Sequence, residues 1–145
     1  MNVKVKILNE FATIPMKGSR WAAGHDLYAA IPSGSVTIKP HETVFIGTGL
    51  AMEIPVTTFG AIFARSGLAN KEGLRPGNCV GVVDSDYRGE VMVGIHNDTD
   101  IAKIIQHGDR IAQLVILPYL VTDFEPTDKL SETDRGVQGF GSTGR

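Results

Sequence analysis

The chain has 145 residues, a length typical of one domain, and a formal net charge of −2 at pH 7. Hydrophobic residues make up 42% of the sequence and charged residues 21%, as in ordinary globular proteins. A chain so close to neutral lacks the overall positive charge that nucleic acids or anionic membranes attract. No stretch of the sequence approaches the roughly 20 apolar residues that span a bilayer. We therefore expect no nucleic-acid or membrane partner, and any anionic ligand must be bound by a local site.

Cysteine usage and the N-terminus predict a cytoplasmic location. Cys79 is the one cysteine of the chain and cannot form an intrachain disulfide, which fits a reducing compartment. Its apolar neighbours, Val80–Val83, favour a small core thiol over a catalytic cysteine, because no base is nearby in the sequence. Residues 1–7 lack the continuous apolar stretch of a signal peptide.

Short apolar runs, punctuated by Gly, Pro, Asn or Asp, begin about every 8–12 residues. The first run, Val3–Ile7, alternates apolar residues with lysines, which predicts an edge strand with one buried face. The later runs are Asp26–Ile31, Val36–Lys39, Thr43–Ile46, Gly49–Ile54, Phe59–Ala64, Val80–Val83, Glu90–His96, Ile101–Ile105 and Ile111–Leu117. This rhythm predicts an all-β sandwich or barrel.

Helix signals are confined to Ser66–Glu72, with Ser66 or a neighbour as N-cap and Gly73 as the stop. Near Pro118 the composition changes, and from Thr122 onward the chain is polar and ends in a glycine-rich stretch. We divide the chain into a β-barrel core over residues 1–121 and a C-terminal arm over residues 122–145. By composition the arm is a flexible tail, unless it orders over a ligand.

The segment Val83–Gly89 is rich in turn formers and, alone, predicts a surface hairpin turn. It also places a carboxylate, Asp84, directly after an apolar strand. A carboxylate within hydrogen-bond reach of a water molecule can act as a general base. Tyr87, three residues later, offers a flat face against which a sugar can pack.

Three further segments carry polar groups suited to phosphate. In Ala64–Ala69, an arginine and a serine stand at the start of the predicted helix, which favours either a simple N-cap or an anion site. Gln113 is polar among apolar residues and needs a polar partner or an ordered water. The arm combines Arg135 and several glycines with hydroxyl side chains, a composition that can wrap phosphates with backbone amides. In the same arm, Phe140 is an isolated aromatic that gains little unless it stacks on a ligand.

Taken together and in this order, five segments resemble the motifs of the trimeric dUTPase family. They are Ala23–Ala30, Ala64–Ala69, Asn78–Gly89, Gly108–Val115 and Arg135–Gly144. The resemblance runs from about residue 20 to the C-terminus. It implies a distorted jelly-roll or β-clip barrel, and a homotrimer with active sites at subunit contacts. The implied activity is hydrolysis of dUTP to dUMP and pyrophosphate with Mg²⁺, which keeps uracil out of DNA and supplies dUMP for thymidylate synthesis.

The resemblance also implies a role for each residue. Asp84 would deprotonate the water that attacks the α-phosphorus, and Tyr87 would pack under the deoxyribose and exclude a 2′-hydroxyl. Asp26 would act through water on Mg²⁺, which the three phosphates themselves chelate. The uracil would be bound by Asn78, Gly81, Val82, Val83 and Met92. The phosphates and the attacking water would be held by Arg65, Ser66, Gly67 and Gln113, with Arg135 on the γ-phosphate and Phe140, Gly141, Ser142 and Thr143 closing over the nucleotide.

Two positions depart from the family pattern. Ala64 stands where the family often has proline, and Gln138 stands where the arm usually has glycine, which restricts left-handed backbone conformations there. Two alternatives remain open. One is a dCTP deaminase of the same fold, which would lack the Arg135–Gly144 motif. The other is a nucleotide-dependent interaction protein on the same scaffold.

Overall fold

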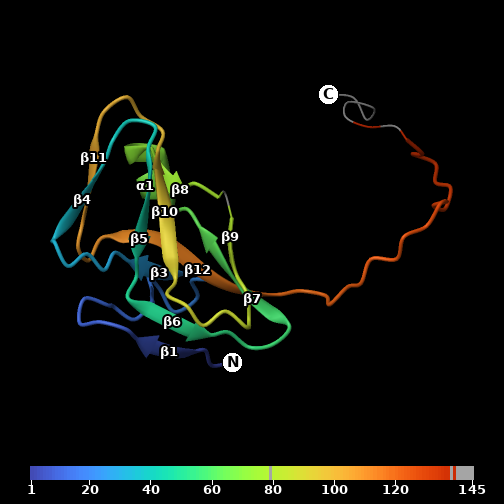
Figure 1. The fold of residues 1–145 in the computed structure, drawn as a ribbon, viewed down its shortest axis with the longest axis horizontal. Helices are drawn as coiled ribbons and strands as arrows, with labels where there is room; N and C mark the ends of the chain where they lie inside the picture. Colours follow the sequence, from blue (N-terminus) through green and yellow to red (C-terminus); the bar gives the residue numbers. More distant parts are fainter. Residues whose placement is uncertain (79, 138, 140–145) are drawn as a thin grey trace.

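The computed structural model describes residues 1–78, 80–137 and 139. These residues form twelve strands and one short helix (Figure 1), so the all-β prediction is confirmed. In chain order the elements are β1 (Lys4–Ile7), β2 (Met16–Lys17), β3 (His25–Tyr28), β4 (Ser35–Ile38), β5 (Thr43–Gly47), β6 (Leu50–Glu53), β7 (Thr58–Phe63), α1 (Ser66–Glu72), β8 (Leu74–Pro76), β9 (Gly81–Val83), β10 (Met92–Asn97), β11 (Lys103–Gln106) and β12 (Arg110–Pro118).

The strands pair antiparallel in four sheets. The largest has the order β2-β3-β12-β7-β9, and a three-stranded sheet has the order β5-β10-β8. Two-stranded sheets, β1-β6 and β11-β4, lie at the margins of the fold (Figure 1). Within the described part of the chain, these sheets do not close into one hydrogen-bonded barrel.

One hydrophobic core joins the four sheets. Its fully buried side chains come from strands in every sheet and include Leu27, Ile38, Leu50, Ile95, Ile105 and Ile111. Along β10 alternate residues are buried, as expected of a strand with one face on the core. Full burial of an aliphatic side chain of this size contributes about 1.5–3 kcal/mol, so the common core stabilises sheets that share no hydrogen bonds.

The N-terminal strand departs from the expected pattern at one end. Val3 and Val5 are half-buried and pack against the core, but Ile7 is 57% exposed. β1 pairs with β6 alone, at the margin of the fold, so its inner face covers the core only over the two valines. The predicted buried face is therefore wrong for Ile7.

Helix α1 spans the predicted residues and ends where the sequence indicated. Gly73 has φ 66°, a left-handed conformation that glycine adopts without steric cost, and its N–H caps the last turn. The N-cap residue is Arg65, and no side chain caps the helix start. The hydroxyl of Ser66 and the guanidinium of Arg65 are thus not used in capping.

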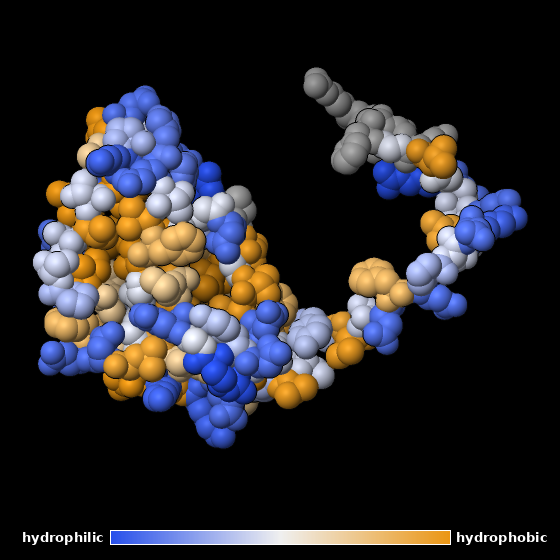
Figure 2. Space-filling model, viewed as in Figure 1, coloured by the Kyte–Doolittle hydropathy of each residue, from blue (hydrophilic) through white to orange (hydrophobic). Residues whose placement is uncertain are grey.

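Beyond β12 the described residues contain no helix or strand, and Figure 1 shows this segment leaving the fold. Apolar residues along it stand open to solvent (Figure 2); they include Leu120, Val121, Phe124 and Leu130. No helix among the described residues is long and apolar enough to cross a membrane.

A buried asparagine ties together the turn that follows β10. Asn97 is fully buried, and its Nδ2 donates to the carbonyl oxygens of Ile38, Lys39 and Ile101 at 3.1, 3.1 and 2.8 Å. Its Oδ1 accepts from the N–H and the hydroxyl of Thr99, at 3.0 and 2.7 Å. One side chain of β10 therefore satisfies backbone groups at the end of β4 and in the turn that follows β10.

Replacing Asn97 by alanine should lower the free energy of unfolding by about 2–4 kcal/mol, because several buried polar groups lose their partner at once. Urea denaturation at one fixed protein concentration measures this. Asp100→Asn serves as control, since that exposed side chain pairs with His41 alone among the described residues and should change stability by less than about 0.5 kcal/mol. A loss below about 1 kcal/mol in Asn97→Ala would contradict the assigned role.

Candidate functional site

Seven of the residues singled out from the sequence line one hollow of about 200 Å³. They are Asn78, Gly81, Val82, Val83, Asp84, Tyr87 and Met92, and Ile62 of β7 completes the wall. We call this hollow the Asp84 pocket. It gathers residues from a strand, a turn and the start of the next strand.

β9 forms one wall of the Asp84 pocket because of its place in the large sheet. It is the last strand of that sheet and pairs with β7 through Gly60↔Val83 and Ile62↔Gly81. An edge strand directs half of its N–H and C=O groups away from the sheet, where a ligand can bind them. A Cβ at Gly81 would lie 3.1 Å from Ile62 Cβ and 3.3 Å from the Asn78 amide nitrogen, so glycine lets the three residues approach closely.

The turn after β9 presents Asp84 and Tyr87 together. The N–H of Tyr87 donates to the carbonyl of Asp84 at 3.2 Å, and its hydroxyl donates to the carbonyl of Glu90 at 3.0 Å. Arg88 clamps the same turn by donating to the carbonyl of Ser85 at 2.7 Å. A side chain at Gly89 would collide with the ring and hydroxyl of Tyr87. These contacts fix the orientation of the Tyr87 ring.

The polar groups of the Asp84 pocket remain available to a ligand. Asp84 is exposed in the single chain, and Tyr87 and Met92 are each 46% exposed. Within residues 1–78, 80–137 and 139, the Asn78 amide has no hydrogen-bond partner. An amide can donate and accept at once, as recognition of a pyrimidine edge requires.

A second group of predicted residues lies at the start of α1 and on the facing strands. Arg65 Nε donates to Asp26 Oδ1 at 2.8 Å, and Arg110 Nη1 approaches Asp26 Oδ2 at 3.4 Å. Gln113 Nε2 donates to the carbonyl of Ala64 at 2.8 Å, which supplies the polar partner that its setting required. We call these residues, with the exposed Ser66 and Gly67, the Arg65 cluster.

Asp26 orients the Arg65 cluster. Its side chain is only 15% exposed, and each of its carboxylate oxygens meets a guanidinium. The cross-strand register brings it there, because Gln113 pairs with Asp26 on one side and with Phe63 on the other. Two arginines around one carboxylate leave an excess of positive charge, which suits a polyanion.

No group of three or more His, Cys, Asp or Glu side chains that could hold a metal occurs among the described residues. Asp26 alone cannot form a metal cage, but a carboxylate can still accept a hydrogen bond from a metal-bound water. Mg²⁺ keeps several waters and is commonly held by one carboxylate together with substrate phosphates. The donor set of the Arg65 cluster fits that arrangement.

Asp84 and Arg65 lie toward opposite ends of β7, whereas Ile62, near the C-terminal end of that strand, also lines the Asp84 pocket. Arg65 follows the C-terminal end of this strand, whereas the antiparallel register carries β9 toward its N-terminal end. Continuing that register by one residue places Asp84 beside Phe59, six positions from Arg65. At about 3.3 Å per residue the two groups are separated by about 20 Å along the strand.

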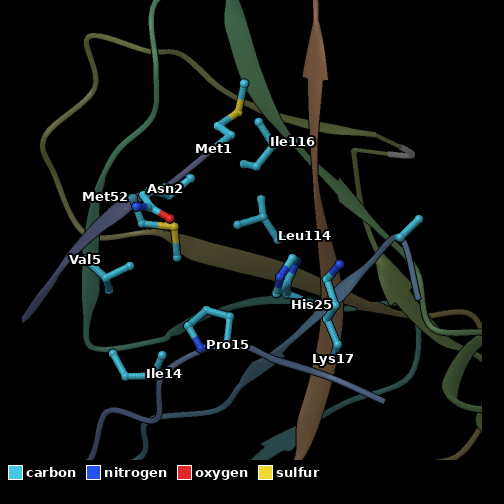
Figure 3. Close-up of a pocket in the computed structure, with 12 residues that line it drawn as sticks. Met1, Asn2, Val5, Ile14, Pro15, Lys17, His25, Met52, Leu114 and Ile116 are labelled. Atoms are coloured by element: carbon cyan, nitrogen blue, oxygen red, sulfur yellow. The ribbon is translucent and has the colours of Figure 1, made fainter. Parts of the chain in front are cut away.

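A larger hollow of about 530 Å³ lies elsewhere, between β1, β6 and β12. Figure 3 shows apolar side chains such as Met52, Leu114 and Ile116 around it, with Lys17 and His25 at one side. None of the site residues predicted from the sequence lines it.

Of the remaining predicted residues, Arg135 lies in the arm that leaves the fold (Figure 1). Phe140, Gly141, Ser142 and Thr143 lie outside the described residues, as do Cys79 and Gln138. Sequence reasoning missed Arg110, which stands inside the Gly108–Val115 segment. Its contact with Asp26 depends on strand pairing between residues 84 positions apart, which no local pattern reveals.

The comparisons place this all-β fold among jelly-roll proteins that bind nucleotides. The structure superposes on that of Staphylococcus bacteriophage 80alpha dUTPase with dUpNHpp, with a TM-score of 0.89, 28% identity and 99% of each chain covered. The family model for dUTPase matches residues 10–144. The chain therefore belongs to the dUTPase family, as the five motifs indicated.

Curated relatives match over nearly their full length. The deoxyuridine 5′-triphosphate nucleotidohydrolase of Desulfitobacterium hafniense is 47% identical over 148 residues, which cover 99% of this chain and 97% of the relative. The protein of the same name from Nautilia profundicola is 45% identical over 145 residues, with both chains fully covered. That of Corynebacterium diphtheriae is 43% identical over 143 residues, which cover 98% of this chain and 92% of the relative.

Proposed function

We propose that this protein hydrolyses dUTP to dUMP and pyrophosphate by attack of water on the α-phosphorus. The observation that carries the proposal is the convergence of Asn78, Asp84, Tyr87 and the edge of β9 on one hollow, in a chain of the dUTPase family. The product dUMP serves thymidylate synthesis, and removal of dUTP keeps uracil out of DNA. A cytoplasmic location is proposed with it, from the cysteine usage.

In the Asp84 pocket each residue takes one part of the nucleotide. Asn78 and the backbone of Gly81–Val83 bind the polar edge of uracil, and Met92 lines the same space. Tyr87, held by its hydrogen bond to Glu90, packs under the deoxyribose and leaves no room for a 2′-hydroxyl. Asp84 orients the attacking water and accepts its proton.

The Arg65 cluster neutralises the triphosphate. Arg65, Ser66, Gly67 and Gln113 hold phosphate oxygens and the attacking water, and Asp26 keeps the Arg65 guanidinium in place. Phosphoryl chemistry depends mostly on positioning and charge neutralisation, so such groups matter more than covalent catalysis. Asp26 would hold Mg²⁺ through water, and the ion would supply further charge neutralisation at the phosphates.

The backbone positions of Asp84 and Arg65 are about 20 Å apart along β7, and this separation supports a site built from more than one chain. We therefore propose a homotrimer in which the Asp84 pocket of one subunit faces the Arg65 cluster of the next. The arm, residues 122–145, crosses to a neighbouring subunit, with Arg135 on the γ-phosphate and Phe140 over the uracil.

A panel of nucleotides tests the function. Purified protein with Mg²⁺ should release pyrophosphate from dUTP and far less from dCTP, dTTP and UTP. The reason is that the pocket contacts the base edge, the ring substituent and the sugar, and each competing nucleotide differs in one of these. Pyrophosphate and nucleoside monophosphate are quantified together. Ammonia release from dCTP without pyrophosphate would indicate the deaminase alternative instead, and binding of dUTP without turnover would indicate the interaction protein.

Asp84→Asn should reduce kcat for dUTP by about 10²–10⁴-fold, because the amide keeps the shape of the carboxylate but cannot accept the proton. Affinity for the non-hydrolysable analogue dUpNHpp should stay close to that of the wild type. Steady-state kinetics and calorimetry measure the two effects. Turnover within about tenfold of the wild type would contradict the assignment of Asp84 as the base.

Removal of residues 131–145 should leave the fold intact and lower kcat far more than it weakens binding, because closure of the arm expels water and fixes the attack geometry. Mixed oligomers of Asp84→Asn chains and truncated chains should regain activity, since some sites then combine an intact Asp84 with an intact arm from a different subunit. Pyrophosphate release after subunit exchange measures this.

Subunit exchange itself is followed separately by mass spectrometry of differently tagged chains. Absence of recovery in proven mixed oligomers would mean that each arm serves its own subunit or none.

A further inference from the structure

A polar row crosses the sheet β5-β10-β8 next to the Asp84 pocket. His96 pairs with Thr43 on one side and with Arg75 on the other. The hydroxyl oxygen of Thr43 lies 2.9 Å from His96 Nδ1, and His96 Nε2 lies 3.5 Å from Asp98 Oδ1. Arg75 donates to Asp98 through Nε at 2.7 Å and Nη2 at 3.0 Å. We call these four side chains the His96 network.

The direction of the hydrogen bond between Thr43 and His96 depends on the imidazole tautomer. In the tautomer that carries its proton on Nε2, the atom that faces the Asp98 carboxylate at 3.5 Å, Nδ1 accepts from the Thr43 hydroxyl. The Thr43 side chain is thereby held in one rotamer against the neighbouring backbone.

That neighbouring backbone belongs to Pro76 and Gly77, the two residues before Asn78. We call these two residues the root of the base-binding segment. A Cβ at Gly77 would be in van der Waals contact with Thr43 Cγ2, at 3.6 Å, so the Thr43 side chain faces this glycine. The N–H of Gly77 donates to the carbonyl of Gly94 at 2.8 Å, and Arg75 Nη1 donates to the carbonyl of Pro76 at 3.3 Å. The two residues before Asn78 are thus held from both sides.

The network also borders the pocket itself. Thr43 and Asn78 line a hollow of about 360 Å³. This hollow shares Ile62, Asn78 and Met92 with the Asp84 pocket. Asp84, in contrast, is held by the pairing of β9 with β7 and by its own turn, neither of which involves the His96 network.

We propose that Thr43 and His96 are positioning residues that hold the root of the base-binding segment and so set the affinity for the uracil ring. This inference rests on the proposed function. Loss of the network should weaken nucleotide binding through Asn78, while attack by water at Asp84 should proceed at the normal rate once dUTP is bound. The signature is therefore a raised KM with an unchanged kcat.

Thr43→Val removes the hydroxyl and keeps the shape of the side chain. It should raise KM for dUTP about three- to tenfold, the effect of one lost hydrogen bond, and leave kcat within about twofold. Thr43→Ser keeps the hydroxyl and should restore KM to the wild-type value. Calorimetry with dUpNHpp should show the same loss and rescue of affinity.

Two substitutions of His96 separate its two contacts. The amide of His96→Asn stands near the place of Nδ1 and can still accept from Thr43, whereas that of His96→Gln stands near the place of Nε2 and reaches only Asp98. His96→Asn should therefore bind dUpNHpp like the wild type, and His96→Gln should resemble Thr43→Val. His41→Asn is the matched control, because His41 has a similar contact with Asp100 at 3.0 Å that does not reach the pocket.

Unchanged dUpNHpp affinity in both Thr43→Val and His96→Gln would overturn the inference, as would a kcat that falls in parallel with affinity. Light scattering and thermal denaturation show whether Thr43→Val or His96→Gln fails to fold or assemble. If one of them fails, the affinity of the other tests the inference. Absence of dUTP turnover in the wild type would instead overturn the proposed function.

Discussion

The antiparallel register between β7 and β9 is the constraint on which the site depends. β7 delivers Arg65 and α1 at its C-terminal end, and β9 runs back along the same strand before it delivers Asp84. Shifting this pairing by one residue would turn every side chain of β9 to the other face of the sheet, so the register cannot adjust to bring the two groups together. In the proposed homotrimer, a neighbouring subunit therefore completes the site that this register divides within one chain.

Close approach of the backbone explains why glycines recur in the motif segments. Gly81 admits Asn78 beside Ile62, and Gly89 admits the ring of Tyr87. In a third segment, a Cβ at Gly24 would lie 2.5 Å from Gln113 Oε1. At each of these positions a functional or wall-forming side chain occupies the space that a Cβ would need. These glycines are needed for packing around the site, and none of the three has a positive φ.

Local patterns in the sequence predicted most of the fold. Helix α1 could be predicted with its bounds because Gly73 supplies a clear stop, and the longer strands followed from apolar runs separated by turn-forming residues. β2 and β8 were missed because two or three residues are too few to show a period, and they form only by pairing with β3 and β10. The prediction that Ile7 is buried was wrong because alternation indicates which face of a strand is apolar but not how far the core extends beneath it.

For the candidate site, too, the sequence predicted residues that lie close together in the chain and missed those that meet only through strand pairing. Apart from Ile62, the residues of the Asp84 pocket stand within fifteen positions of one another, from Asn78 to Met92, so one motif could indicate nearly all of them. Arg110 and the His96 network depend on contacts across strands, and Thr43 meets His96 over a separation of 53 residues. Periodicity and motif spacing carry no information on such pairs, because the pairing of strands is decided by the core as a whole.

The described residues that follow β12 are exposed to solvent in the single chain. Residues 119–137, which follow β12, expose Leu120, Val121, Phe124 and Leu130 to solvent and carry five carboxylates against two cationic side chains. Near the Asp84 pocket, Phe45, Val82 and Met92 are exposed as well. Apolar side chains gathered on a surface mark places where another surface binds, whereas carboxylates repel one another and keep the arm extended until it finds cationic groups. In the proposed homotrimer, the exposed apolar side chains of this segment supply a surface for contact with a neighbouring subunit.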